Sequence, residues 1–516
     1  MPRTIERISP TGTINRRAVV TDLENDQVLV RENCYIVGEK PYLRVKKFPG
    51  SDRYNSTSVG SSPVVWAHRY YTKANLRKNF FFSGGSIYHI DDNGNTTQGL
   101  SVFSPIAYPT SVEMRVSDTD ILYFSEGINT GMYSYDGNSG NTFLKETAVT
   151  LNFVGMVGHL DRIFGFEEDS EDLYFSVNLT PTNFTDSTDA GFITIGAKRG
   201  SKIQQIIVYQ ETLFIFKTDS IWVLNGRTPS EFSVQEVNPS LGLAARRSLQ
   251  ASSNVLVGLM SDYEIHSFGG TQESMVLLTY GVSLSGGLLN NDTLLPILNL
   301  DKMENICSVF HNNMYRMSFT ENGDTTNKLE YIFNFINKTD AFTRGNNVSC
   351  YLKYDRVPDK NELVTGRSDL GRLMHQYRGL NWDNQGTSPT MRLRLQTAFF
   401  GSGTPRNIRI RRYWMNLGVL GAQPLPIGIL LDGRTAVTDS TSDEMVTRGE
   451  FKLVAGLNIQ SQDAITSRQT PRHNNSKCLN FSLFIDHTAN NFDTEFSSID
   501  VEIITKNLKR SQKVGV

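Results

Sequence analysis

The stretch TLFIFKTDSIWVLNG, residues 212–226, contains the pattern that decides the fold. A run of apolar residues leads into the polar turn 218–220, and a second apolar run with a tryptophan ends at Asn225 and Gly226. Short runs rich in Ile, Phe, Val and Trp, broken by Asp, Ser and Gly, are typical of a β-hairpin. The stretch therefore predicts two strands joined by a tight turn.

This hairpin pattern occurs seven times. The hairpins begin at residues 80, 121, 162, 212, 255, 314 and 362, so successive starts are 41 to 59 residues apart. A four-stranded blade of a β-propeller takes ~40–50 residues and buries its faces only against neighbouring blades. Residues 63–380 are therefore predicted to form a degenerate β-propeller of about seven blades, with an array of β-sandwiches as the alternative. The other six hairpins are FFFSGGSIYHI, ILYFSEGINTGMYSYDG, RIFGFEEDSEDLYFS, VLVGLMSDYEIHSFGG, MYRMSFTENGDTTNKLEYIFNF and ELVTGRSDLGRLMHQY.

The rhythm of the strands changes after Gly379. NWDNQGTSP at 381–389 has the composition of a linker, and alternating apolar residues follow in segments such as CLNFSLFID and SIDVEIITK. Alternation with a period of two is typical of half-buried strands. Residues 381–516 are therefore predicted to form a C-terminal β-sandwich with a basic tail. Residues 1–62 are predicted to be an extended arm whose strands close the ring or the sandwich.

Charge and composition exclude several classes of protein. The 516 residues include 51 Lys and Arg and 53 Asp and Glu, so the formal net charge is −2. Such a neutral chain is not built around a strongly basic nucleic-acid surface. The first residues lack the apolar segment of a secretory signal, and no apolar stretch reads as a membrane span.

Motifs that carry chemistry are missing from the sequence. It contains no HExxH, GxSxG or phosphate-loop motif. The acidic run EEDSED at 167–172 suits a solvated hairpin turn better than a pair of glycosidase carboxylates. DDNGN at 91–95 lacks the distal Glu of a calcium loop, and GAKRGSK at 196–202 lacks phosphate-loop spacing. We therefore expect no catalytic residues, no metal and no cofactor.

A basic strand in the C-terminal region is the one candidate interface. In RNIRIRRYW at 406–414, alternation would place Ile408 and Ile410 in the core, and Arg409 and Arg411 on the outer face, followed by Arg412 and Trp414. These arginines could bind phosphate, pair with acids of a neighbouring subunit, or cover a solvated face. We predict a contact with a partner protein, made by Arg409, Arg411, Arg412 and Trp414.

Three patches of the sequence resemble the nozzle proteins of short-tailed bacteriophages, also called packaged-DNA stabilisation proteins. The first patch is 212–270, where the hairpin at 212–226 is followed by NPSLG and by a strand that ends in Gly-Gly. The second is YLRVKKFPGSDRY at 42–54, similar to the stretch before the first blade in that family. The third is ELVTGRSDLGRLMHQY at 362–377, similar to its last blade.

The resemblance implies a structural virion protein of the tail, made in the host cytoplasm, with no enzymatic activity. Such a subunit would form a homo-oligomeric ring, expected to be a hexamer, at the distal end of the tail. Its partners would be the tail adaptor or portal-proximal ring above, and fibres, spikes or a plug below. Genomic double-stranded DNA would be retained and then pass through the channel during ejection. The alternative function is a propeller that binds or hydrolyses glycans.

Overall fold

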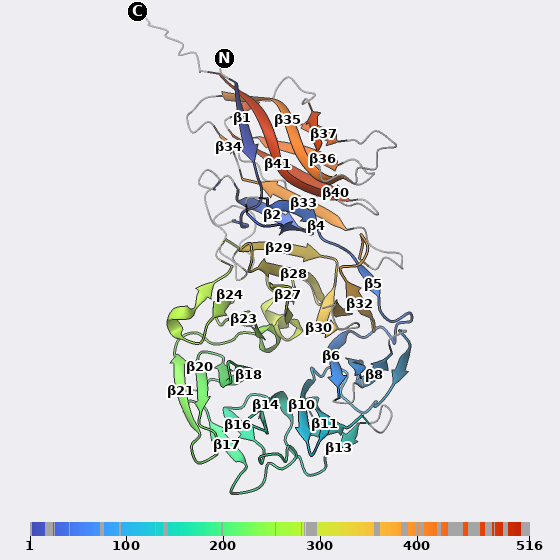
Figure 1. The fold of residues 1–516 in the computed structure, drawn as a ribbon, viewed down its shortest axis with the longest axis vertical. Coiled ribbons are helices and arrows are strands. Elements are labelled where there is room, and N and C mark those ends of the chain that lie inside the picture. Colours follow the sequence, from blue (N-terminus) through green and yellow to red (C-terminus); the bar gives the residue numbers. More distant parts are fainter. Residues whose placement is uncertain are drawn as a thin grey trace, which may run out of the picture.

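The computed structural model shows a ring of small β-sheets joined to a two-sheet β-sandwich (Figure 1). In the strands of 401–480, 487–494 and 505–506, only the backbone is described. The structure describes residues 3–15, 24, 26–40, 42–72, 77–91, 94–128, 131–137, 143–197, 200–252, 254–279, 281–282, 284, 297–354, 362–382, 391–398, 400–401, 407–420, 425–431, 447–451, 465–469, 477–478, 480–488 and 494–506.

The ring is a seven-bladed β-propeller, as the repeated hairpins predicted. Six blades are separate four-stranded sheets, and the seventh set of four strands, β26–β29, continues into a larger sheet. Each hairpin in the sequence supplies the second and third strands of one blade; residues 212–226, for example, contain β19 and β20. The first strand of the last blade, β30, packs against β6 of the first blade, so the ring is closed.

The strands of each blade follow one another along the chain, except at the last blade. Blades 1 to 3 contain β6 (Val64–Tyr71), β7 (Arg77–Ser83), β8 (Ser86–Ile90), β9 (Thr96–Gln98); β10 (Thr110–Val116), β11 (Thr119–Ser125), β12 (Met132–Tyr135), β13 (Leu144–Lys145); and β14 (Phe153–His159), β15 (Arg162–Glu167), β16 (Asp172–Phe175), β17 (Gly191–Thr194). Blades 4 and 5 contain β18 (Ile203–Tyr209), β19 (Thr212–Lys217), β20 (Ile221–Asn225), β21 (Ser233–Asn238); and β22 (Gln250–Ala251), β23 (Leu256–Leu259), β24 (Ile265–Phe268), β25 (Val276–Leu277). Blades 6 and 7 contain β26 (Cys307–His311), β27 (Met314–Thr320), β28 (Asn327–Asn334), β29 (Thr339–Arg344); and β30 (Val348–Tyr354), β31 (Glu362–Arg367), β32 (Leu373–Gln376) with β5 (Ser51–Arg53). Three 3₁₀ helices lie between blades or strands: η1 (Arg246–Ser248), η2 (Gln272–Ser274) and η3 (Leu300–Asn305).

The core of the ring lies between blades. Phe80 of blade 1 packs edge-on against Tyr135 of blade 2, with ring centroids 5.0 Å apart, and both are fully buried. Between blades 3 and 4, Phe164 and Ile215 belong to one buried cluster. Burying such a side chain stabilises the fold by ~1.5–3 kcal/mol, so each blade depends on its neighbours for its core.

The N-terminal residues contribute strands to both parts of the molecule. β5 pairs with β32 as the fourth strand of blade 7. The earlier strands β1 (Arg3–Ile8), β2 (Val28–Glu32), β3 (Cys34–Val37) and β4 (Arg44–Lys47) all join the sheets of the sandwich. The arm therefore closes the ring and also completes the sandwich.

The sandwich is built mainly from the C-terminal strands. Its first sheet has the order β3-β4-β41-β35-β38, with β1 beside β41 and β39 beside β35. Its second sheet has the order β2-β33-β40-β36-β37, with β34 beside β40. The C-terminal strands are β33 (Arg392–Thr397), β34 (Phe400–Gly401), β35 (Asn407–Leu420), β36 (Leu425–Leu431), β37 (Thr447–Phe451), β38 (Ile465–Gln469), β39 (Lys477–Cys478), β40 (Asn480–Thr488) and β41 (Thr494–Lys506).

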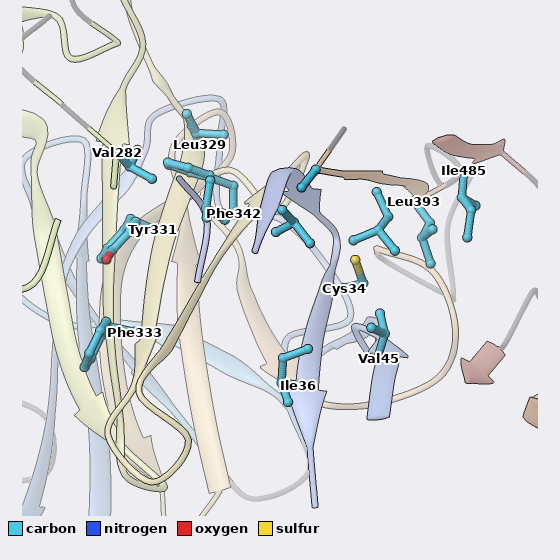
Figure 2. Packing of buried hydrophobic residues seen from close by; sticks show 14 of the residues in the cluster. Cys34, Ile36, Val45, Val282, Leu329, Tyr331, Phe333, Phe342, Leu393 and Ile485 are labelled. Carbon is cyan, nitrogen blue, oxygen red and sulfur yellow. The ribbon is translucent and has the colours of Figure 1, made fainter. Parts of the chain in front are cut away.

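The propeller and the sandwich share one sheet and one hydrophobic core. β2 pairs in parallel with β29 of blade 6, at Glu32 and Phe342, and pairs antiparallel with β33 of the sandwich. Figure 2 shows the core that continues across this junction, from Tyr331 and Phe342 in blade 6 to Leu393 and Ile485 in the sandwich. The two parts are therefore packed against each other as one unit. Of the predicted linker 381–389, only Asn381 and Trp382 lie within the described residues.

Candidate binding pocket at the centre of the propeller

A pocket in the described part of the chain lies where segments of five blades come together. It has a volume of about 360 Å³ and is bounded by the starts of β10, β14 and β18, by η1 and η3, and by the turn after β15. Tyr108 and Arg247 also line a neighbouring cavity of about 90 Å³. The loops of propeller blades can therefore present side chains from five blades to one space.

Arg247, in η1, contacts several blades of the ring. Its Nη2 donates to the carbonyl oxygens of Val65 in blade 1 (2.8 Å) and Ser349 in blade 7 (2.6 Å). The guanidinium carbon lies 5.0 Å from the centre of the Tyr108 ring, and Ser308 of blade 6 donates to the Arg247 carbonyl. Arg247 therefore joins η1 to blades 6, 7 and 1.

Replacing Arg247 with alanine should destabilise the propeller by about 2–4 kcal/mol. The change removes two charge-assisted hydrogen bonds and one cation–π contact, and leaves two carbonyl groups without that donor. The free energy of unfolding in urea measures the effect. Arg227→Ala is the control, because Arg227 is exposed on blade 4 and its loss should cost under about 0.5 kcal/mol. Equal stability of the two variants would show that Arg247 does not hold the blades together.

Paired charges form the rim of the pocket. The Arg246 Nη2 donates to both carboxylate oxygens of Glu168, at 3.0 and 2.9 Å. Beside this pair, Lys202 lies 3.1 Å from Asp169. The Glu168 side chain is 58% exposed, whereas that of Arg246 is 20% exposed. The rim therefore presents both signs of charge, and opposite charges lie next to each other.

The acidic run 167–172 forms the turn between β15 and β16, where the sequence predicted a turn. Its acids are not simply solvated, because Glu168, Asp169 and Glu171 each lie beside a basic side chain of blade 4 or η1. For Glu171 this partner is Lys217, whose buried ammonium also donates to the Ile195 carbonyl at 2.6 Å. The run therefore joins blades 3 and 4.

The described His, Cys, Asp and Glu side chains do not form a metal-binding group, and the described thiols are buried. No group of three His, Cys, Asp or Glu side chains there could hold a metal ion. Burial raises the pKa of Cys34 and Cys350 to about 12, and raises the pKa of Cys307 as well, so these thiols stay protonated at neutral pH. His266 contacts its neighbour Asp262 at 2.8 Å. The helices of the described ranges include none with the length and apolar character of a membrane span.

The predicted interface strand 406–414 lies within or beside β35 of the sandwich. Arg409 pairs with Ile504 of β41, and Arg412 pairs with Glu502. The register shifts between Ile410 and Arg412, so Arg411 is at a β-bulge and the simple alternation assumed from the sequence is interrupted there. The side chains of Arg409, Arg411, Arg412 and Trp414 lie outside the described residues, so this interface remains a prediction.

Other predicted features fall only in part within the described residues. Of DDNGN, residues 92 and 93 lie outside them, and the Asp91 carboxylate accepts a hydrogen bond from the Asn95 backbone as in an ordinary turn. Of GAKRGSK, residues 198 and 199 lie outside them, and the remainder connects β17 to β18 at the rim of the pocket. No continuous motif marks the pocket, because it is formed by residues separated by almost 200 positions.

Fold and site together define a β-propeller with a fused sandwich and a polar central pocket. No family model and no curated protein matches the chain. Among solved structures, it is similar to a streptogramin B lyase (14% identity, 63% of this chain and 96% of that chain, TM-score 0.39). It is also similar to the extracellular domain of a one-component system from B. thetaiotaomicron (11%, 81% and 48%, TM-score 0.42) and to virginiamycin B lyase from Staphylococcus aureus (11%, 61% and 94%, TM-score 0.36).

Proposed function

We propose that the protein is a structural subunit of the distal nozzle of a short bacteriophage tail, with no catalytic activity. Three patches of sequence that resemble the nozzle family support this, and they lie at blade 7 with its closing arm and at blades 4 and 5. The observation that carries the proposal is that the propeller and the sandwich share one sheet and one hydrophobic core. A subunit that must hold its place between one tail ring and the components below it benefits from a junction that cannot bend.

Buried polar contacts support this rigidity at the junction. Arg31 is fully buried and donates to the carbonyls of Asp340 in blade 6 and of Pro10 and Gly12 in the arm, at 2.6–3.0 Å. Asn33 of the arm donates to a carbonyl of β33 in the sandwich and accepts from the backbone amide at the end of β29. Because these donors connect three segments of the chain, bending the junction would leave buried polar groups unpaired.

The position of Arg247 constrains how such a nozzle would handle DNA. This side chain links η1 to blades 7 and 1, so we treat the propeller of one subunit as part of a wall and not as the channel itself. In our proposal the DNA channel is the lumen that several copies enclose. A net charge of only −2 suits that role, because each phosphate neutralised by a basic lumen would add affinity and slow the passage of DNA.

Imaging of particles tests the proposed location. We expect antibodies against this protein to label the distal tip of the tail, and particles made without it to lose packaged DNA and to lack the components below. Label on the capsid, or a protein absent from purified particles, would contradict the proposal.

A double change in the basic strand tests the predicted docking contact. Changing Arg409 and Arg411 to serine should reduce incorporation of the protein into particles by more than about tenfold, because bidentate arginine–carboxylate pairs repeated around a ring add up. Quantitative immunoblotting of purified particles gives the readout. Normally assembled tails with a salt-dependent change in DNA ejection would instead assign the arginines to DNA.

A further inference from the structure

The smaller of the two cavities lined by Arg247 differs in charge from the larger one. This cavity of about 90 Å³, called the Arg247 cavity below, is bounded by segments next to blades 1, 2 and 5 to 7. Among the described residues that line it, Arg247 is the only charged one and none is acidic. Most of the others carry a hydroxyl or an amide group. The wall therefore combines one positive charge with neutral polar groups.

The positive charge of Arg247 has no carboxylate partner among the described residues. Its Nη2 donates to the carbonyl oxygens of Val65 and Ser349, whereas its Nη1 is buried and has no hydrogen-bond partner there. The acids next in sequence to lining residues each lie beside a basic side chain: Glu304 with Lys302, Asp324 with Lys328, and Asp369 with Arg367. A charge removed from water is unfavourable unless it is compensated, so an anion in the cavity would supply the missing counter-charge.

Two hydroxyl groups of the cavity are not used by the fold. The lining side chains that already donate hydrogen bonds within the protein are Tyr108, Asn305, Asn327, Ser349 and Ser368. By contrast, Thr325 and Thr326 make no side-chain hydrogen bond in the described part of the chain, in the turn between β27 and β28. Thr325 is exposed and Thr326 is half-buried, so an ion could enter along this turn. Both hydroxyl groups can donate to it.

These donors favour a phosphate group over other ligands. A cation would meet Arg247 and no acid. A planar carboxylate is best bound by two parallel bonds from an arginine, but the Arg247 Nη2 is already bound to two carbonyls. A tetrahedral anion can accept from donors that lie on different elements, here η1 and the turn of blade 6. The volume equals that of roughly three water molecules at ~30 Å³ each, which leaves room for one phosphate group but not for a sugar or a base.

We infer that the Arg247 cavity binds a single phosphate group, held by Arg247, Thr325 and Thr326. The group could be free phosphate, or the end of a phosphate ester whose substituent stays outside the turn. This binding does not depend on the proposed place of the protein in a tail, because it rests only on the cavity and its charge.

Phosphorus NMR on the full-length protein tests this inference. The probes are inorganic phosphate and glycerol phosphate at constant ionic strength, and a ligand of this size should bind with a Kd on the order of 1 mM. The phosphate resonance should broaden and the effect should saturate. Binding of inorganic phosphate identifies the free ion as a ligand, and binding of glycerol phosphate alone identifies an ester. Absence of broadening with both probes would overturn the inference.

A double variant tests the two threonines. Changing Thr325 and Thr326 to valine keeps their shape and removes both hydroxyl groups, so phosphate binding should weaken by at least about tenfold. Thr97→Val is the matched control, because Thr97 is an exposed threonine on β9 and should not affect binding. Unchanged binding by the folded double variant would contradict the site.

The charge of Arg247 is tested separately, because this side chain also supports the blades. Arg247→Met should abolish phosphate binding, with the melting temperature reporting whether the variant is folded. If it does not fold, the threonine variant still decides the question. Competition in the wild type tests the choice of anion: sulfate should displace phosphate, and acetate should do so at least about tenfold less well. Equal displacement by acetate would overturn the choice of a tetrahedral ligand.

Discussion

Changing Glu330 to glutamine should lower the free energy of unfolding by about 3–5 kcal/mol, because Arg316 would remain buried without its counter-charge. The Arg316 Nε and Nη2 donate to the two carboxylate oxygens of Glu330 at 2.6 and 2.8 Å, and these side chains are 1% and 2% exposed. Tyr351 and Thr343 donate to the same carboxylate, and the Tyr377 hydroxyl accepts from Arg316. The glutamine amide cannot replace all of these interactions.

Denaturant unfolding of Glu330→Gln measures this cost, provided that the slope with denaturant stays unchanged. The matched control is Lys328→Met, which removes an ion pair on the same strand whose lysine is 47% exposed. Exposed pairs contribute ~0–1 kcal/mol, so the control should behave almost as the wild type does. A loss of less than about 1 kcal/mol in Glu330→Gln would mean that the buried pair within blade 6, with its contact to Tyr351 of blade 7, contributes little to stability.

The same carboxylate should make the protein sensitive to acid. Burial raises the pKa of Glu330, but the charge of Arg316 and the hydrogen bonds from Arg316, Tyr351 and Thr343 outweigh it and hold the pKa below its usual range. A folded-state pKa below the unfolded value of ~4.3 contributes stability that is complete above the unfolded pKa. This contribution disappears as the pH falls through the folded pKa. Stability measured below about pH 5 should therefore fall less steeply in Glu330→Gln than in the wild type.

The second and third strands of each blade could be predicted from the sequence because their local signals agree. In 80–90, for instance, three phenylalanines lead into Gly84 and Gly85, both of which adopt positive φ in a turn. The first strands were harder to find, since their turns do not use glycine. Leu160 and Asp161 between β14 and β15, and Gln210 and Glu211 between β18 and β19, all have positive φ. Such residues are uncommon in this conformation, and neighbouring strands must impose it on them.

Contacts between distant segments could not be predicted. The sequence does not predict β38 of the sandwich, because its residues ITSRQ show little alternation of apolar and polar side chains. The pocket was missed because its walls come from the end of one loop in each of several blades. Two sequence pairs at blade starts, Gln204–Gln205 and Arg246–Arg247, are the only local sign of it.

Deleting residues 1–62 should leave no folded protein, a larger effect than any single substitution here. The deletion removes β5, whose residues Ser51 to Arg53 pair with Gln376 to Met374 as the edge of blade 7. It also removes β2, the strand between blade 6 and the sandwich. The deletion also removes close backbone packing between the arm and the segment after blade 7. A Cβ on Gly50 would lie 2.0 Å from the Asn381 carbonyl oxygen. The free energy of unfolding of an ordinary domain is ~5–15 kcal/mol in total. We expect the loss of the strand pairing of both β2 and β5 to cost more than that.

Adding the arm back as a separate chain tests why the deletion prevents folding. It distinguishes the loss of the arm's contacts from a requirement that the arm be the first part of the same chain to be synthesised. Apart from the peptide bond after residue 62, the described residues of 1–62 contact the remainder non-covalently. One example is the buried Asn55 side chain, whose Oδ1 accepts from the Leu373 amide at 2.8 Å. Co-expression of 1–62 with 63–516 should therefore restore soluble protein with a cooperative thermal transition, whereas 1–62 carrying Asn55→Ala should restore it less well, by about 1–3 kcal/mol. Circular dichroism and size-exclusion chromatography give the readouts. If 63–516 alone unfolds cooperatively at the temperature of the full chain, then β5 does not close the ring and the blades are held by their inner strands alone.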